Sequence, residues 1–278
     1  MKNIIKITLL AALLLPFAKI KAQEKTPANK WKLGVALWTF HRFPIDESIT
    51  KIDSSGLHYM EGSVFQKGGT AIEQVNLMAM TNEGIEKFKN YMKAHHIKMP
   101  SMYIFGGPSI DGWIKSFDLA KKLELEFVTA EPPKAMWDNV DSLAGIYHIK
   151  VALHNHWNGM SIYWHPDSVL AAIKNHPNFG VCPDLGHYPK SGLDGVEALR
   201  KLKGHIFAIH LKDADKFGDV KANDVNIGTG VVNFPAVAKE LKRQHYKGYI
   251  FIERDADYKP SNLPSVIQEV NYFNNIFK

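Results

Sequence analysis

Eight short apolar runs, each followed by a longer segment of helical periodicity, dominate residues 31–278. The runs are rich in β-branched and aromatic residues, which is typical of strands. The predicted strands cover residues 33–38, 57–60, 97–104, 126–130, 149–153, 179–182, 206–209 and 249–252. The predicted helices cover residues 45–55, 83–95, 112–123, 137–147, 166–175, 195–202, 234–245 and 263–277.

Apolar strands separated by helices indicate a parallel sheet whose two faces are covered. Eight such units in roughly 250 residues match the size of a (β/α)8 barrel. We therefore predict the α/β class and a single-domain (β/α)8 TIM barrel over residues 31–278. An open doubly wound sheet is the alternative, and it is disfavoured because no G-x-G-x-x-G turn follows the first predicted strand.

The first 22 residues have the features of a secretory signal peptide. Lys2 and Lys6 give a positive start, residues 7–18 are apolar, and residues 20–22 form an acceptable cleavage site. This apolar run is too short to cross a bilayer core of about 30 Å as a helix. An uncleaved membrane anchor is the alternative, and the short run disfavours it. Since no cysteine follows the run, a lipoprotein anchor is excluded. We expect a signal peptide at 1–22, a short linker at 23–30, and a periplasmic or secreted protein with no transmembrane segment after processing.

The net charge of +6 suggests a polyanionic partner such as nucleic acid. Removing the signal peptide would remove four lysines and leave +2, so we expect no nucleic-acid partner. The single cysteine, Cys182, excludes an intramolecular disulfide and a thiolate zinc cluster. The sequence is compatible with assembly into a homo-oligomer.

Ionisable residues stand where the predicted strands end, which is where TIM barrels build their active sites. Strands five to eight run into His154, Asp184, His210 and Glu253, while Trp38, Glu61 and Glu131 end strands one, two and four. Imidazoles and carboxylates without thiols suit a divalent ion such as Mn²⁺, Co²⁺, Zn²⁺ or Mg²⁺. A lone histidine after a strand is more often a hydrogen-bonded loop residue. Four consecutive strands with this feature favour a site for one divalent metal ion.

The series HNH, PDLGH, HLKD and IE after strands five to eight resembles the xylose isomerase-like TIM barrels. It is most similar to their sugar phosphate isomerase/epimerase branch, which includes ketose 3-epimerases and inosose dehydratases. The resemblance covers nearly all of residues 31–278. It implies one divalent metal ion, held by residues at the ends of strands five to eight: His154, Asp184, His210 and Glu253.

The sequence departs from that family at residue 154, where the family commonly has glutamate. In ketose epimerases this glutamate also acts as one of two opposed bases, so the replacement puts that mechanism in doubt. Glu253 is a candidate for one of the two bases, and Glu131 is a candidate for the other. The alternative for Glu131 is a loop carboxylate held before Pro132 and Pro133.

Further site residues follow from the same positions. The resemblance implies that His187 contacts substrate oxygens, and His156 is expected to do the same or to orient a ligand. Trp38 is a candidate for stacking on a sugar, with packing as its alternative role, and Glu61 is a further candidate substrate contact. Lys212 is a candidate catalytic cation that stabilises an enolate oxygen, and its alternative is a salt bridge to Asp213.

A divalent ion on adjacent hydroxyl and carbonyl oxygens of a sugar favours proton removal next to the carbonyl. We therefore expect an exported isomerase or epimerase that acts on a small sugar or glycoside, and export favours an unphosphorylated keto sugar. The first alternative is a lyase that cleaves 3-keto-glycosides by β-elimination. A metallonuclease of the endonuclease IV type and a non-catalytic sugar-binding barrel are the remaining alternatives.

Overall fold

The structure, a computed structural model, describes residues 31–256 and 259–278. The predicted signal peptide and linker lie outside the described residues. The described part carries the barrel, and none of its helices is long and apolar enough to span a membrane.

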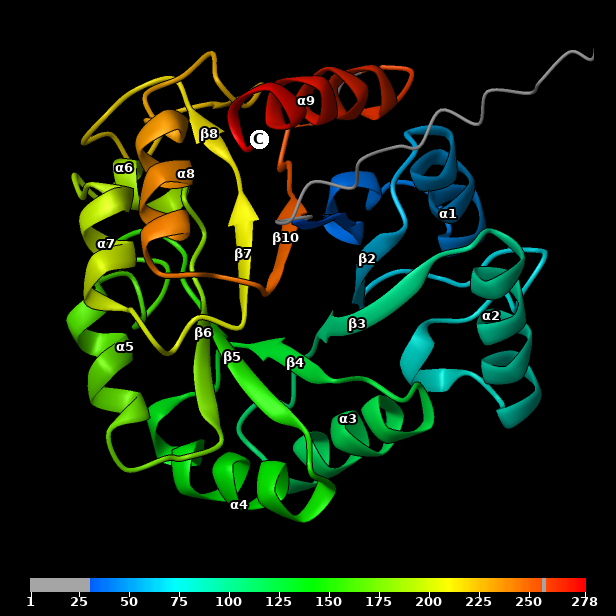
Figure 1. Ribbon diagram of the computed structural model, residues 1–278. Helices are drawn as coiled ribbons and strands as arrows, with labels where there is room; N and C mark the ends of the chain where they lie inside the picture. Colours follow the sequence, from blue (N-terminus) through cyan, green and yellow to red (C-terminus); the bar gives the residue numbers. More distant parts are fainter. Residues whose placement is uncertain (1–30, 257–258) are drawn as a thin grey trace, which may run out of the picture. The chain divides into compact units, whose positions relative to one another are not determined.

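Eight parallel strands form one sheet that curls into a nearly closed ring (Figure 1). The strands are β1 (Lys32–Ala36), β2 (Tyr59–Ser63), β3 (Lys98–Tyr103), β4 (Phe127–Ala130), β5 (Lys150–His154), β6 (Phe179–Cys182), β7 (Ala208–Leu211) and β10 (Tyr249–Ile252). Their order is β6-β5-β4-β3-β2-β1-β10-β7. Parallel bridges between Val181 and Ile206 and between Asp184 and His210 join the two ends of this order. The predicted TIM barrel is confirmed.

Helices follow the strands and cover the outside of the ring (Figure 1). They are α1 (Ile45–Ser54), α2 (Asn82–Ala94), α3 (Ile110–Lys122), α4 (Trp137–Tyr147), α5 (Pro166–Ile173), α7 (Gly195–Lys201), α8 (Phe234–Arg243) and α9 (Leu263–Ile276). Side chains of Thr81, Ser109, Asp194 and Asn233 accept backbone N–H groups at the starts of α2, α3, α7 and α8. These caps satisfy amides that the helix itself leaves unpaired.

Most strand boundaries differ by one to three residues from the sequence-based prediction, and the differences at β1, β2 and β7 matter for the site. β1 ends at Ala36, and Leu37–Phe40 form a 3-10 helix that places Trp38 beyond the strand. β2 continues to Ser63 because Gly62 and Ser63 pair with β3, so Glu61 lies within the strand. β7 covers Ala208–Leu211, so His210 also lies within its strand, where it pairs with β10.

Short elements that the sequence did not predict extend the carboxyl ends of the strands. A four-residue helix, α6 (His187–Lys190), follows β6. β8 (Asp213–Ala214) and β9 (Asp224–Val225) pair as an antiparallel ribbon after β7. Further 3-10 turns cover Leu77–Ala79 and Lys134–Met136.

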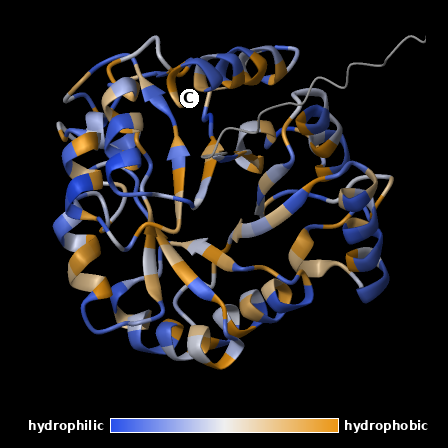
Figure 2. Ribbon diagram, in the orientation of Figure 1, coloured by the Kyte–Doolittle hydropathy of each residue, from blue (hydrophilic) through white to orange (hydrophobic). Residues whose placement is uncertain are grey.

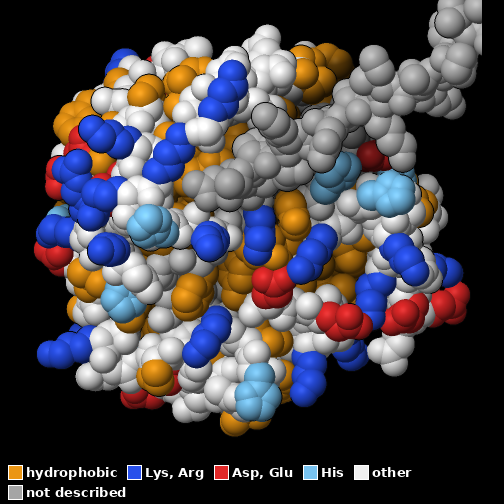
Figure 3. All heavy atoms as spheres, viewed as in Figure 1, with side chains coloured by type: hydrophobic (Ala, Val, Ile, Leu, Met, Phe, Trp, Pro, Cys, Tyr) orange, Lys and Arg blue, Asp and Glu red, His pale blue; other side chains and the backbone are white. Residues whose placement is uncertain are grey.

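Apolar residues fill the space between the helices and the strands. Figure 2 shows hydrophobic and hydrophilic residues alternating along the outer helices, as expected for helices with one buried face. A second apolar cluster comes wholly from strand residues: Ala36, Phe127, Ala152, Cys182, Ala208, Tyr249 and Phe251. On the face drawn in Figure 3, basic side chains are interspersed with acidic, apolar and uncharged polar ones.

Candidate functional site

A cavity of about 340 Å³ lies at the carboxyl ends of the strands. Its buried wall is polar, while its outer wall carries exposed apolar side chains. The lining residues are Ala36, Leu37, Trp38, Glu61, Gly62, Ser63, Phe65, Tyr103, Phe105, His154, His156, Met160, Lys212, Glu253 and Asp255. This is the end of a TIM barrel at which active sites form.

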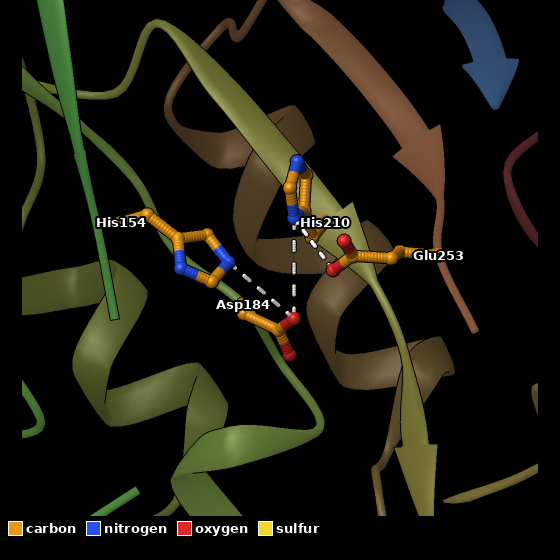
Figure 4. Close-up of side chains that lie close together, drawn as sticks. All are labelled: His154, Asp184, His210 and Glu253. Atoms are coloured by element: carbon orange, nitrogen blue, oxygen red, sulfur yellow. Dashed lines mark hydrogen bonds and ion pairs between the residues drawn. The ribbon is translucent and has the colours of Figure 1, made fainter. Parts of the chain in front are cut away.

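Four buried donor side chains converge beside this cavity (Figure 4). His154 ends β5, Asp184 follows β6, His210 lies in β7, and Glu253 follows β10. One donor atom from each lies within 4.8 Å of the others. Asp184 Oδ2 is 3.7 Å from His154 Nε2 and 3.9 Å from His210 Nδ1. The expected ligand set is therefore assembled in one place.

Two donor atoms of this cluster make no hydrogen bond within the described part of the chain. They are His154 Nε2 and Asp184 Oδ2, both buried, and the nearest ion-pair contact of the latter is 3.3 Å, to Lys212 Nζ. Leaving such groups unpaired costs roughly 1–3 kcal/mol each, so buried polar atoms normally have partners. Two imidazole nitrogens and two carboxylates match the donors of Zn²⁺, Mn²⁺ or Co²⁺ sites. The residues present fit one divalent ion.

A glutamate fixes the orientation of each cluster histidine. His154 Nδ1 donates to Glu131 Oε1 at 2.9 Å, and His210 Nε2 donates to Glu61 Oε2 at 2.6 Å. Because an ionised carboxylate only accepts, these two nitrogens carry protons, and the opposite ring nitrogens face the cluster, where His210 Nδ1 lies 2.8 Å from Glu253 Oε2. Carboxylate partners of this kind fix the tautomer and the ring position of metal-binding histidines. His154 thus presents Nε2, and His210 presents Nδ1.

Both oxygens of Glu61 have partners. Oε2 faces His210, and Oε1 accepts from Ser101 Oγ at 3.0 Å and from Thr129 Oγ1 at 2.5 Å. Glu61 is predicted as a substrate contact, and it does line the cavity. Its hydrogen bonds give it a second task, which is to hold His210 in place.

Glu131 lies behind two histidines. Its Oε1 accepts from His154 and from His156 Nδ1, the latter at 2.5 Å, and its Oε2 accepts from Ser161 Oγ at 2.5 Å. Tyr103 OH donates to Oε1 at 3.3 Å. Burial would raise the pKa of Glu131, but the two histidines hold it well below its ordinary value. Glu131 is an ionised group that orients its neighbours, and its role as a second base stays a prediction.

Lys212 is a buried cation among three carboxylates. Its Nζ lies 2.9 Å from Asp255 Oδ2, 3.2 Å from Glu253 Oε2 and 3.3 Å from Asp184 Oδ2. Burial opposes the charge, but these carboxylates raise the pKa of Lys212 well above its ordinary value. The alternative partner, Asp213, instead accepts backbone N–H groups from Ala214, Gly228, Gly230 and Val232.

The cluster holds protons that a cation would displace. Burial disfavours a charged imidazole, yet the carboxylates of Asp184 and Glu131 raise the pKa of His154 to about 9. Burial also opposes the charge of Glu253, but His210 and Lys212 hold the pKa of Glu253 well below its ordinary value. Metal binding to such a site releases protons.

The remaining predicted substrate contacts occupy different depths. His156 lines the cavity, and its ring stacks on His187 with centroids 4.9 Å apart. His187 is fully buried, with Nε2 3.3 Å from Lys212 Nζ, and burial lowers its pKa well below the ordinary value. Trp38 is 38% exposed at the outer wall, and its indole N–H donates to Asp255 at 3.1 Å.

Several supporting residues are absent from the sequence-based prediction. Ser101 and Thr129 are hydroxyl residues inside apolar strands, and that contrast is a signal that could have identified them. Tyr103 and Ser161 carry no local signal, because they meet Glu131 only through the fold.

Comparisons with known proteins agree with this fold. A sequence model described as xylose isomerase-like TIM barrel matches residues 52–275. The chain is similar to the solved structure of an uncharacterised protein from Parabacteroides distasonis, with 31% identity and a TM-score of 0.70. That match covers 88% of this chain and 98% of the other.

Two curated relatives match over shorter stretches. Inosose dehydratase from Mesomycoplasma hyopneumoniae is 25% identical over an alignment of 142 residues, and the match covers 45% of each chain. L-ribulose-5-phosphate 3-epimerase UlaE from Salmonella paratyphi A is 38% identical over 79 residues, which are 28% of this chain and 27% of the relative. The chain thus spans less than half the length of these curated relatives.

Proposed function

The chain belongs to the xylose isomerase-like TIM barrel family, and on that premise we propose that it is a divalent-metal-dependent isomerase or epimerase of an unphosphorylated keto sugar. The observation that carries the proposal is the convergence of four buried donors beside the cavity, two of which have an atom without a hydrogen bond to the described residues. The similarity to an L-ribulose-5-phosphate 3-epimerase supports it. The predicted export of the chain supports a substrate without phosphate, since sugar phosphates are chiefly cytoplasmic.

His154, Asp184, His210 and Glu253 would hold the ion. When bound, it would supply Lewis-acid polarisation of the sugar carbonyl. The chain's own residues would bind the sugar in the cavity and bring its acidic carbon next to a base. Proximity of this kind accounts for much of the rate advantage of an enzyme.

Glu253 is the proposed base. Its pKa lies well below the ordinary value, so it is ionised, and it lines the cavity. A carboxylate placed there can take the proton from the carbon next to the carbonyl and return one to the same or a neighbouring carbon. Return to the neighbouring carbon gives an isomer, whereas inversion of the same carbon needs a second acid on the opposite face, for which Glu131 is the candidate.

Lys212 would stabilise the negative charge that develops on the carbonyl oxygen. It is fixed by three carboxylates and also lines the cavity. A preoriented cation in a site that excludes water lowers the barrier more than the same charge does in water.

A lyase is the second candidate, and one observation favours it. Residue 154 is a histidine whose Nδ1 is bound to Glu131, so the cluster lacks the second, opposed carboxylate that ketose epimerases use. Elimination needs a single base to remove the proton, after which a group β to the carbonyl leaves. The similarity to inosose dehydratases supports this outcome, and a 3-keto-glycoside would lose its aglycone in the same way.

Incubation with substrates in D₂O distinguishes the two candidate functions. The Mn²⁺-loaded chain would be incubated with ketoses and with 3-keto-glycosides. Deuterium on the carbon next to the carbonyl, without fragmentation, supports the isomerase or epimerase, while release of an aglycone supports the lyase. If the loaded protein exchanges no proton with either class, enolate chemistry is refuted and a non-catalytic sugar-binding barrel takes its place.

A further inference from the structure

Four large apolar side chains stand exposed around the cavity, and we call them the apolar rim: Trp38, Phe65, Phe105 and Met160. Their exposed fractions are 38%, 52%, 60% and 62%. All four line the cavity, together with His154 and Glu253 of the four-residue donor cluster. Single exposed apolar residues are common on protein surfaces, but several gathered at one cavity mark a binding surface.

The apolar rim is built from four separate loops. Trp38 follows β1, Phe65 follows β2, Phe105 follows β3, and Met160 follows β5. Each loop follows a different strand, so local packing within one segment does not explain why all four side chains line one cavity. The placement indicates a ligand.

The rings continue from the rim toward the cluster. Trp38 and Phe65 have ring centroids 6.4 Å apart, Phe65 and Tyr103 6.2 Å, and Tyr103 and His154 5.8 Å. Trp38 is held by its hydrogen bond to Asp255. An apolar surface therefore runs from the outer wall to a cluster histidine, so one molecule can touch both.

The charge of the lining argues against an anionic group at the rim. Among the described lining residues, Lys212 is the single lysine or arginine. It is 1% exposed, and three carboxylates surround it. Phosphate groups are normally held by several arginine or lysine donors or by a helix N-terminus. The rim instead offers ring faces and a thioether, which suit a flat uncharged group.

We propose that the apolar rim is a subsite for an aromatic aglycone, so that the substrate class is aryl glycosides that carry a free keto group elsewhere on the sugar ring. This inference rests on the proposed function for the position of the sugar itself. The aryl ring contacts the side chains of the apolar rim, while the sugar reaches toward Lys212, His154 and Glu253, which line the same cavity.

Calorimetric titration of the full chain, loaded with Mn²⁺, tests this without turnover. The probes are phenyl and methyl glycosides of glucose, galactose and xylose. We expect the phenyl glycoside of at least one sugar to bind about tenfold more tightly than its methyl counterpart, which is the size that ring stacking contributes. Phe65→Ala and Phe105→Ala should each reduce that advantage to about threefold or less and leave the methyl glycoside unchanged.

Phe217→Ala is the matched control, since Phe217 is 58% exposed and is not among the cavity-lining residues. In this variant, the ratio of phenyl-glycoside affinity to methyl-glycoside affinity should equal that of the unmodified chain. Equal binding of phenyl and methyl glycosides overturns the subsite but leaves the proposed function standing. An advantage that persists in both rim variants, or an equal loss in the control, also overturns the subsite. A protein that binds no phenyl glycoside also overturns the subsite, and the proposed function is then judged by the exchange in D₂O alone.

Discussion

Replacing Glu61 by glutamine should weaken metal binding without disturbing the barrel. Glu61 is 1% exposed, and Oε1 accepts from the hydroxyls of Ser101 and Thr129. Those two donors keep the amide oxygen of a glutamine on their side, so its NH₂ group faces His210 Nε2. Two donors then oppose each other, and His210 moves its proton to Nδ1, the nitrogen that faces the cluster. That nitrogen can no longer bind a cation.

The expected loss in metal affinity is about 10- to 100-fold, as for other carboxylates that support a histidine ligand. This corresponds to roughly 1.4–2.7 kcal/mol. Competition of Glu61→Gln with a fluorescent chelator for Mn²⁺ and Zn²⁺ measures it. Glu240→Gln is the control, because Glu240 is also buried but bonds to Arg200 and Arg243 on the outer helices. An affinity for Glu61→Gln within twofold of the unmodified chain would refute this account of His210.

Three further outcomes follow from the structure. Because the pKa of His154 is raised to about 9, the metal must displace a proton below that pH, and affinity for Mn²⁺ should rise by up to about tenfold per pH unit between pH 6 and 8; a flat profile in calorimetry contradicts this. Lys212→Met should bind metal more tightly, since a like charge is removed, yet lose about 100-fold or more in deuterium exchange; parallel losses in both measurements would assign Lys212 a structural role only. Gly34→Ala should destabilise the chain by about 1–3 kcal/mol in urea unfolding, because a Cβ would lie 2.4 Å from the Tyr59 carbonyl oxygen, whereas Gly195→Ala has room and should change little.

The fold could be predicted because strands and helices differ in period along the whole barrel. The positions of the metal cluster residues could also be predicted, since each stands at the end of an apolar run and a barrel brings such ends together. The exact ends of the strands were harder to predict. His210 was expected beyond its strand and lies inside it, because β7 pairs with β10 two residues further than the apolar pattern indicates.

The contacts that orient the cluster could not be read from the chain. Glu61 and His210 are separated by 149 positions, and Glu131 meets Ser161 only after two strands and a loop are in place. No spacing rule encodes such pairs. For the same reason, the apolar rim emerges only when loops from four strands are seen at one cavity.

The metal content of the purified protein tests the central claim most directly. The full chain is loaded with Mn²⁺, desalted and measured by mass spectrometry, together with Asp184→Ala, His210→Ala and the exposed control Asp138→Ala. The account predicts about one ion per chain in the unmodified protein and the control, and less than about one tenth in the two cluster variants. An unmodified chain that retains no divalent ion, or cluster variants that retain as much as the control, would contradict it.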